Sequence, residues 1–268
     1  MITLSTKNLF TDLAKMSQED LKANLVKFLK KHYKTVVEAP YYVYAIGDID
    51  IALMAHLDTV FTESKEKRIF CDEENEIIWS PEGLGADDRA GVFAILKIVT
   101  KHKMRPHVVF TLDEEVGGTG ARELAKIKNP FENLKYIIQL DRRGQNDSVF
   151  YKCNSKEFEF YINSFDFETN IGTYSDISFV CPAWGIAGVN LSVGYENEHT
   201  NAEYLNLHYL NLTIQKVVEM LKHSSKISTF KYQEDNVCDL CGKEAVVRFD
   251  NYNLSLCHDC WEVLGWRN

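Results

Sequence analysis

The chain has 268 residues, of which 45% are hydrophobic and 26% are charged, and its formal net charge is −9 at pH 7. This negative charge argues against a general nucleic-acid-binding protein, because such proteins usually carry a basic face. No apolar run approaches the length of a membrane span, and the N-terminus lacks the basic start and apolar stretch of a signal peptide, so we expect a cytoplasmic protein that does not enter membranes.

The first predicted elements are an amphipathic helix and a group of strands. Apolar side chains recur at helical spacing over residues 10–32, and Ser17 with Asp20 resembles a capping pair, which indicates a break near residue 17. After this helix, short apolar stretches predict two strands and a hairpin, at residues 41–47, 50–56 and 68–80.

A second helix is expected over residues 87–102, with Asp87 and Asp88 at its start, where the helix dipole favours anions. Beyond it, strands and helices alternate. Strands are predicted at residues 107–112, 135–140, 156–163 and 185–193, and helices at residues 119–126 and 203–223. This alternation predicts a three-layer α/β fold, in which helices cover both faces of a mostly parallel, mixed sheet.

A change of composition near residue 225 divides the chain. We predict a catalytic domain over residues 1–225, a polar linker over residues 226–236 and a small module over residues 237–268. The module contains two CxxC pairs with fifteen residues between them, formed by Cys238, Cys241, Cys257 and Cys260. Four thiolates at this spacing predict a closed, tetrahedral structural zinc site.

The module resembles a zinc ribbon or a treble clef. Its central residues allow a hairpin around Asp250 and Asn251, and a helix can start after Cys260. About thirty residues cannot bury enough apolar surface alone, so the metal would supply folding energy. No basic patch stands out, so we expect a structural role or a protein partner for the module rather than a nucleic acid.

Metal-type side chains stand where three of the predicted strands end. They are His56 in the strand at 50–56, Glu114 and Glu115 after the strand at 107–112, and Asp141 after the strand at 135–140. The carboxyl ends of strands in an open α/β sheet border one crevice. His199 follows the strand at 185–193 through a short loop and can reach the same edge. With Asp87, these donors match two zinc ions that share one carboxylate.

The residue types indicate a division of roles. Asp58 lies two residues beyond His56 and projects from the same side of an extended backbone, so it can orient the imidazole. Asp87 can bridge two cations with its two oxygens. Of the adjacent Glu114 and Glu115, one would bind metal and the other would take a proton from the attacking water.

Each of these residues also has an ordinary structural explanation. Taken alone, His56 fits a buried core histidine, Glu114 and Glu115 fit a solvated turn, and Asp87 fits a helix cap. Their joint occurrence at the ends of several elements is what favours a metal site.

Six segments resemble, in order, the motifs of co-catalytic zinc aminopeptidases and peptidase T-like tripeptidases. They are HLDTV (56–60), GADDRAG (85–91), DEEVGGTGA (113–121), LDRRG (140–144), GTYSDISF (172–179) and EHTNAEYL (198–205). The resemblance implies one zinc on His56 and Asp141, a second on Glu115 and His199, and Asp87 as the bridge between them.

The resemblance also implies the catalytic residues. Glu114 would act as general base and then as general acid, and Asp58 would orient His56. A cis peptide bond is expected between Asp87 and Asp88. Co²⁺ or Mn²⁺ are alternatives to Zn²⁺ at this centre.

One feature separates the chain from the carboxypeptidase-like branch of this superfamily. That branch carries a large lid domain between the fourth and fifth ligands, whereas only 57 residues separate Asp141 from His199 here. The chain is therefore more similar to the single-domain aminopeptidases. Candidates for contacts to the substrate are Tyr174, Asp176 and Tyr195.

Together, these observations predict a zinc-dependent hydrolase that cleaves an amide bond, as an aminopeptidase or small-peptide peptidase. An N-acyl amino-acid deacylase or other amidase would use the same metals and base, so the sequence leaves this alternative open. A third hypothesis is an idle hydrolase fold that acts as a binding protein through its C-terminal module.

Overall fold

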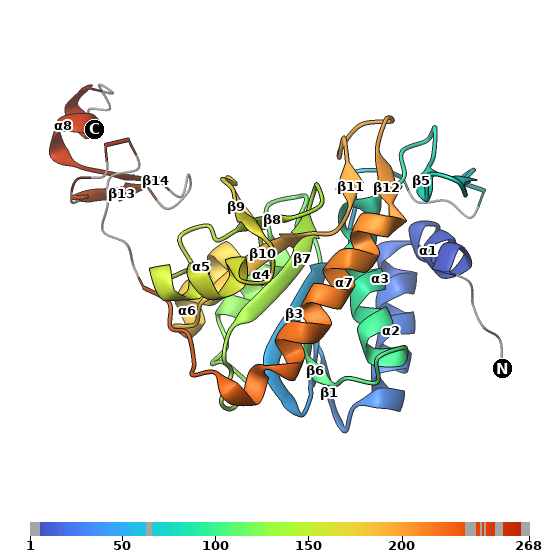
Figure 1. The fold of residues 1–268 in the computed structure, drawn as a ribbon, viewed down its shortest axis with the longest axis horizontal. Coiled ribbons are helices and arrows are strands. Elements are labelled where there is room, and N and C mark those ends of the chain that lie inside the picture. The colour runs from blue at the N-terminus through green and yellow to red at the C-terminus, as the bar shows by residue number, and fades with distance from the viewer. Residues whose placement is uncertain are drawn as a thin grey trace.

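The centre of the protein is an eight-stranded mixed sheet (Figure 1). A computed structural model describes residues 6–62, 66–233, 240–241, 243, 245–249 and 254–263. In spatial order the strands are β1 (Thr35–Glu38), β2 (Tyr42–Ile46), β6 (Pro106–Thr111), β3 (Ile49–His56), β7 (Ile137–Arg142), β10 (Gly188–Ser192), β8 (Asp147–Val149) and β9 (Glu168–Thr169). The inner strands β6, β3, β7 and β10 run parallel, while β1, β2 and β8 pair in antiparallel fashion with their inner neighbours.

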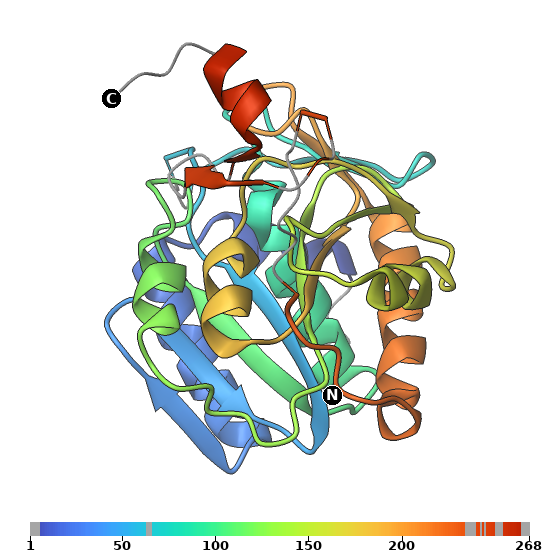
Figure 2. The ribbon, with the colours of Figure 1, turned by 90° about the vertical axis from the view of Figure 1, so that its left-hand side faces the viewer.

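The inner strands are apolar on both sides because helices cover both faces of the sheet. In β3, Leu53 and Ala55 face one hydrophobic core, while Ala52 and Met54 face the other. The first core is covered by α1 (Thr6–Ala14), α2 (Gln18–His32), α3 (Ala86–Thr100), α5 (Lys156–Asn163) and α7 (Leu207–Lys222), and the second by α4 (Thr119–Ala125) and α6 (Ile177–Trp184). Figure 2 shows α4 and α6 in front of the sheet and α2 behind it. The predicted three-layer α/β fold is confirmed.

The break expected near residue 17 is present in the structure. Helix α1 ends at Ala14 and α2 begins at Gln18. Ser17 caps α2, because its hydroxyl accepts a hydrogen bond from the backbone N–H of Asp20 at 3.1 Å.

The strand predicted at residues 156–163 is wrong, because this segment is helix α5. The hydroxyl of Ser155 caps the helix by accepting a hydrogen bond from Phe158 N (3.2 Å). Phe158 and Ile162, four residues apart, are buried, while Phe160 between them is 80% exposed. The sequence alternates as a strand would, but the cap and the four-residue spacing favour a helix.

A second, small sheet lies beside the main one. Its strands are, in order, β11 (Tyr195–Glu196), β12 (Tyr204–Asn206), β5 (Ile77–Trp79) and β4 (Phe70–Asp72). The antiparallel pair β4–β5 confirms the hairpin predicted at residues 68–80. The helix predicted from residue 203 begins later, at Leu207, because residues 204–206 pair with β5.

The C-terminal part begins with a segment that packs on the α/β domain. A short 3-10 helix, η1 (Ser224–Lys226), follows α7, and Phe230 is buried against the first core. Beyond it stand β13 (Val247–Phe249), β14 (Leu254–Leu256) and α8 (His258–Val263), at the upper left of Figure 1. The antiparallel pair β13–β14 fits the expected hairpin, whose turn lies outside the described residues, as does Cys238.

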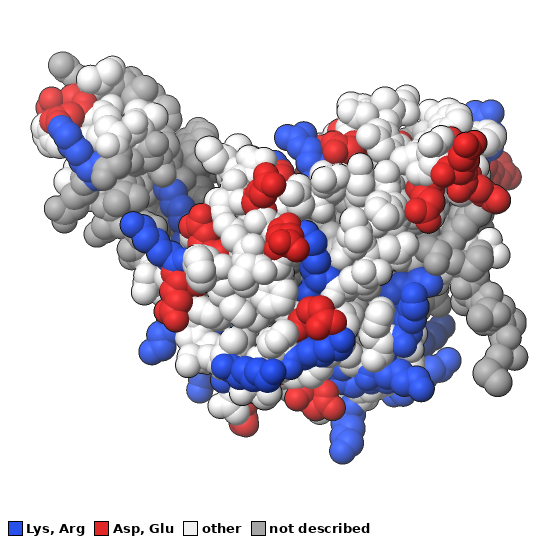
Figure 3. All heavy atoms as spheres, in the orientation of Figure 1, with Lys and Arg blue, Asp and Glu red and all other residues white. Residues whose placement is uncertain are grey.

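Charge is unevenly distributed over the face in Figure 3. Lysines and arginines gather along its lower part, where α2, α3 and α7 end. The last turns of these helices carry Lys30, Lys31, Lys97 and Lys222, which suits the negative end of each helix dipole. Among the described helices, none combines the length and the apolar character that crossing a bilayer requires.

Candidate metal centre

The sheet order places three of the candidate segments side by side. His56 is the last residue of β3, which lies between β6 and β7 in the sheet. Glu114 and Glu115 follow β6 in a turn, and Asp141 lies in β7 one residue before its end. The parallel direction of the strands therefore brings these side chains to one edge, as the sequence predicted.

The imidazole of His56 is buried and surrounded by three carboxylates. Its Nδ1 lies 3.2 Å from Asp58 Oδ1. Its Nε2 lies 3.1 Å from Asp87 Oδ1 and 3.5 Å from Asp141 Oδ1. If Nδ1 donates its hydrogen to Asp58, the lone pair of Nε2 points between Asp87 and Asp141.

His199 approaches the same aspartate from the other side. It lies in the loop between β11 and β12 and is half-exposed. Its Nε2 is 3.3 Å from Asp87 Oδ2 and 3.1 Å from Glu115 Oε1. Asp87 thus turns one carboxylate oxygen toward each of the two histidines.

These donors fit two tetrahedral divalent ions. With ligand bonds of about 2.0–2.1 Å, neighbouring ligand atoms around a tetrahedral zinc ion lie about 3.3 Å apart. The four nitrogen–oxygen distances from His56 and His199 range from 3.1 to 3.5 Å. The donors are imidazole nitrogens and carboxylate oxygens. Both types bind zinc, and carboxylate oxygens also bind the harder ion manganese.

Residues 46–171 match the family model described as peptidase family M28. These residues form an M28 peptidase domain. The resemblance drawn from the six motifs is therefore confirmed, and the protein is a metallopeptidase. No curated protein matches the sequence significantly.

Solved structures of peptidases share the fold of the M28 domain. A tripeptidase from Staphylococcus aureus superposes with a TM-score of 0.67 at 16% identity, covering 83% of this chain and 98% of that one. The aminopeptidase PepT from Bacillus cereus gives 0.61 at 15% identity, covering 82% and 98%. The TET1 peptidase from Pyrococcus horikoshii gives 0.62 at 16% identity, covering 81% and 99%.

Asp87, the candidate bridging ligand, lies in the first turn of α3 and has non-helical backbone angles. The peptide bond between Asp87 and Asp88 is cis, as the resemblance predicted. Asp88 is fully buried, and its two oxygens accept hydrogen bonds from His56 N (3.1 Å) and Gly91 N (2.9 Å). Asp88 therefore ties the start of α3 to the end of β3, directly behind His56.

Glu203 is a supporting residue of the candidate metal centre to which the sequence reasoning gave no role. Its buried carboxylate accepts hydrogen bonds from Gly85 N at 2.6 Å and from Asp87 N at 3.1 Å. Burial raises the pKa of Glu203 to about 7, although the bonds from the backbone oppose the rise. The residue joins the segment of His199 to the loop of Asp87. Its place in the motif at residues 198–205 was the available signal.

Asp58 also holds the turn that carries the two glutamates. Its Oδ1 and Oδ2 accept hydrogen bonds from the backbone N–H groups of Glu114 (3.0 Å) and Glu115 (2.9 Å). Burial opposes ionisation of Asp58, but the hydrogen bond and charge of His56, together with the backbone hydrogen bonds from Glu115 and Glu114, outweigh it and hold the pKa of Asp58 below its ordinary value. One ionised carboxylate thus fixes both the imidazole and the glutamate turn.

Without cations, the acids of the centre compete for protons. Burial raises the pKa of Glu114 to about 9, and the nearby charge of Asp141 adds to the rise. Burial and the charge of Asp87 raise the pKa of Asp141 to about 8. Burial acts in the same direction on Asp87, but hydrogen bonds from His199 and His56 hold its pKa below the ordinary value. Bound cations would favour the ionised form of all three acids.

The three candidates for substrate contacts lie in different surroundings. The half-buried Tyr174 donates a hydrogen bond to the carbonyl of Glu114 (3.3 Å), and a Cβ on Gly118 would come within 2.1 Å of its hydroxyl. Tyr195 is buried, and its hydroxyl lies 3.3 Å from Asp141 Oδ1. Asp176 is fully buried and accepts a hydrogen bond from Thr111. Of these three candidates, Asp176 and Tyr195 are buried, and Tyr174 is the one that is partly exposed.

Proposed function

We propose that this metallopeptidase is a two-zinc aminopeptidase or small-peptide peptidase. The observation that carries the proposal is the Asp87 carboxylate, which lies between the two imidazoles with one oxygen at 3.1 Å and the other at 3.3 Å. His56 and Asp141 would hold one ion, and Glu115 and His199 the other. Co²⁺ or Mn²⁺ would be tolerated at the same donors.

The chemistry follows from the positions of the side chains. Metal ions at this centre supply a Lewis acid for the scissile carbonyl and make a water molecule acidic. Glu114 takes the proton from that water and later returns it to the leaving amine. Asp58 keeps the glutamate turn and His56 in place throughout, because it is bonded to both.

The substrate class follows from the absence of a separate lid. The segment between Asp141 and His199 contains β8, β9, α5, α6, β10 and β11, all of which pack in or beside the main sheet. His199 remains half-exposed, so the centre is open to short peptides. The similarity in fold to aminopeptidases and a tripeptidase supports exopeptidase activity.

The variant Glu114→Gln tests the general base. Its amide cannot accept the proton of water, so kcat should fall by on the order of 10²–10⁴-fold while the metal content stays unchanged. The matched control is Glu123→Gln, at an exposed glutamate of α4 that pairs with Lys126. Aminoacyl anilides measure turnover, and elemental analysis measures bound metal. Near-normal turnover would refute the role of Glu114, and loss of metal would make it a ligand instead.

A substrate comparison tests the reaction class. Zinc-loaded and cobalt-loaded protein should hydrolyse aminoacyl anilides and short peptides faster than N-acyl amino acids. The opposite preference would identify a deacylase. A fully metal-loaded protein that cleaves neither class would contradict the peptidase proposal and favour a binding protein.

A further inference from the structure

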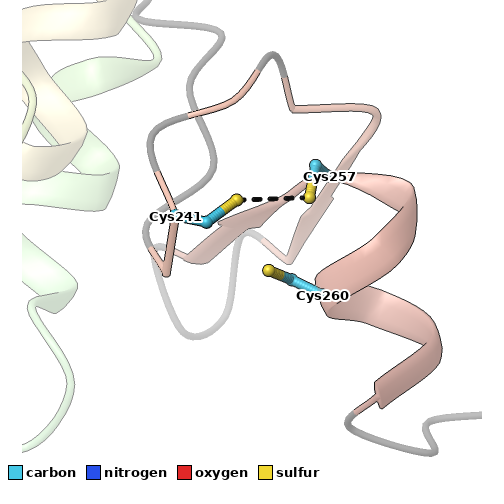
Figure 4. Close-up of side chains that lie close together, drawn as sticks. All are labelled: Cys241, Cys257 and Cys260. Carbon is cyan, nitrogen blue, oxygen red and sulfur yellow. Dashed lines mark hydrogen bonds between the residues drawn. The ribbon is translucent and has the colours of Figure 1, made fainter.

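Three thiols of the C-terminal module converge outside the peptidase centre. Cys241 lies in a turn, Cys257 directly follows β14, and Cys260 lies in the first turn of α8. Figure 4 shows their sulfur atoms pointing toward a common space. The Sγ atoms of Cys241 and Cys257 are 3.5 Å apart, and the three sulfurs all lie within 4.8 Å of one another.

We infer that these thiolates hold one soft divalent cation of the zinc class, which stabilises the folded module. Zinc–sulfur bonds of about 2.3 Å in a tetrahedral site place neighbouring sulfurs about 3.8 Å apart. The 3.5 Å between the Cys241 and Cys257 sulfurs lies close to this value, and none of the three sulfur pairs exceeds 4.8 Å. Cys238, which the sequence analysis placed in the same site, lies outside the described residues.

The described residues of the module bury little apolar surface. Within its described part, the buried cluster consists of Leu256 and Cys257, with Cys260 and Trp261 packed against it. A unit of about thirty residues with so little apolar burial usually requires a metal or a covalent crosslink. Cys257 is 5% exposed, so one of the ligands is already desolvated inside this cluster.

An ion pair joins two of the cysteine-bearing segments. Lys243 Nζ forms an ion pair with Asp259 Oδ2 at 2.7 Å, which links the turn at Cys241 to helix α8. His258 is not among the converging donors, and its Nδ1 lies 3.6 Å from Glu262.

The thiol cluster and the peptidase centre differ in their chemistry. Sulfur donors select zinc, cadmium or cobalt, whereas the carboxylate-rich centre also suits manganese. The module contacts the M28 domain through Lys152 Nζ, which donates a hydrogen bond to Ser255 Oγ at 3.3 Å. Ser255 lies in β14, two residues before Cys257, so metal in the module would also fix the strand that makes this contact.

Cobalt substitution of the full chain tests the inference. Co²⁺-loaded protein should show the intense thiolate-to-cobalt charge-transfer bands of a tetrahedral sulfur site. Cys241→Ser should lose most of this absorption and about one equivalent of metal. Cys71→Ser, at the cysteine of β4, is the matched control and should keep both. His56→Ala should keep the charge-transfer bands even where it empties the peptidase centre, which separates this inference from the proposed function.

Thiol labelling of the wild-type protein tests the same site without a variant. In zinc-loaded protein, Cys241 should resist alkylation despite its exposed position, and addition of a chelator should make it reactive. Absence of charge-transfer bands from the wild type, or equal labelling of Cys241 with and without a chelator, would overturn the inference.

Discussion

Asp87 is the residue on which both halves of the centre depend. Its two oxygens face different histidines, so in the proposed two-metal centre this one carboxylate would fix the distance between the ions. Several other acids lie close by, and burial raises the pKa of most of them. Buried acids of this kind are costly unless cations neutralise them, so their burial favours a bound metal.

Glu203 should act through Asp87 rather than on the substrate. Both of its oxygens accept backbone hydrogen bonds, and a glutamine would turn an NH₂ group toward one of those donors. Glu203→Gln should therefore weaken metal binding by about 10–100-fold. Isothermal titration with Zn²⁺ measures the change, and Glu196→Gln, at a neighbouring acid of β11, should leave the affinity unchanged. Unaltered affinity in Glu203→Gln would show that its bonds are dispensable for the centre.

His107 should make stability depend on acid pH. Its buried Nδ1 accepts a hydrogen bond from Gly47 N (3.1 Å), and its ring stacks on Phe131. Burial lowers its pKa to about 4 from the ordinary 6.5. Between these pH values the unfolded chain binds more protons than the folded one, so stability is complete above pH 6.5 and is lost as the pH falls toward 4.

The size of this loss is about 2–3 kcal/mol for His107 alone. His107→Asn keeps an acceptor for Gly47 but does not titrate, so its unfolding free energy should fall less between pH 6.5 and pH 4 than that of the wild type. Urea denaturation at the two pH values measures the difference, with His208→Asn, at an exposed histidine, as the control. Parallel loss of stability in wild type and His107→Asn would rule out this linkage.

At the scale of elements, some helices and strands could be predicted from their local sequence, and others form only because of their neighbours in the fold. The inner strands were predictable because each is a short apolar run, and their ends carried most of the metal-type residues. Helix α5 could not be predicted from its sequence, because the spacing of Phe158, Phe160 and Ile162 fits the two-residue period of a strand as well as part of a helical period. Short strands such as β9 and β11, of two residues each, have no signal of their own and exist through their partners.

The exposure pattern of α5 gives a direct prediction. Phe158→Ala should cost about 3–5 kcal/mol of unfolding free energy, because the side chain is fully buried beside Tyr136 and Phe230. Phe160→Ala should stay within about 0.5 kcal/mol of the wild type, because this side chain faces solvent. Chemical denaturation distinguishes them. A strand would place both rings on one face and would make the two losses similar.

Sequence patterns identified the candidate site residues at strand ends, but not the contacts between residues that are far apart in the sequence. His56 and Asp141 could be found from strand ends, because their positions follow from one short segment each. The hydrogen bonds that Glu203 accepts join residues 118 and 116 positions apart, and no local pattern reveals such a contact. The burial of Asp176 likewise follows from the packing of α6 on the sheet, so the sequence alone left it as a substrate contact.

At the scale of the whole molecule, metal binding should stabilise the fold. An ion that binds only the folded state adds about 2.7 kcal/mol at a free concentration one hundred times its Kd. Mn²⁺ tests the carboxylate centre selectively, because thiolates favour softer ions. The Tm should rise with Mn²⁺ in the wild type and rise less in His56→Ala, as measured by scanning calorimetry. Equal shifts in both proteins would mean that the stabilising ion binds elsewhere.

The candidate ligands are spread along the chain from His56 to His199. The imidazole of His199 comes from the loop between β11 and β12 of the small sheet, which follows the strands of the main sheet in the sequence. A polypeptide that stops before β11 would lack this imidazole and could not complete the proposed two-metal centre. Peptide cleavage should therefore begin only once the chain has been synthesised beyond His199.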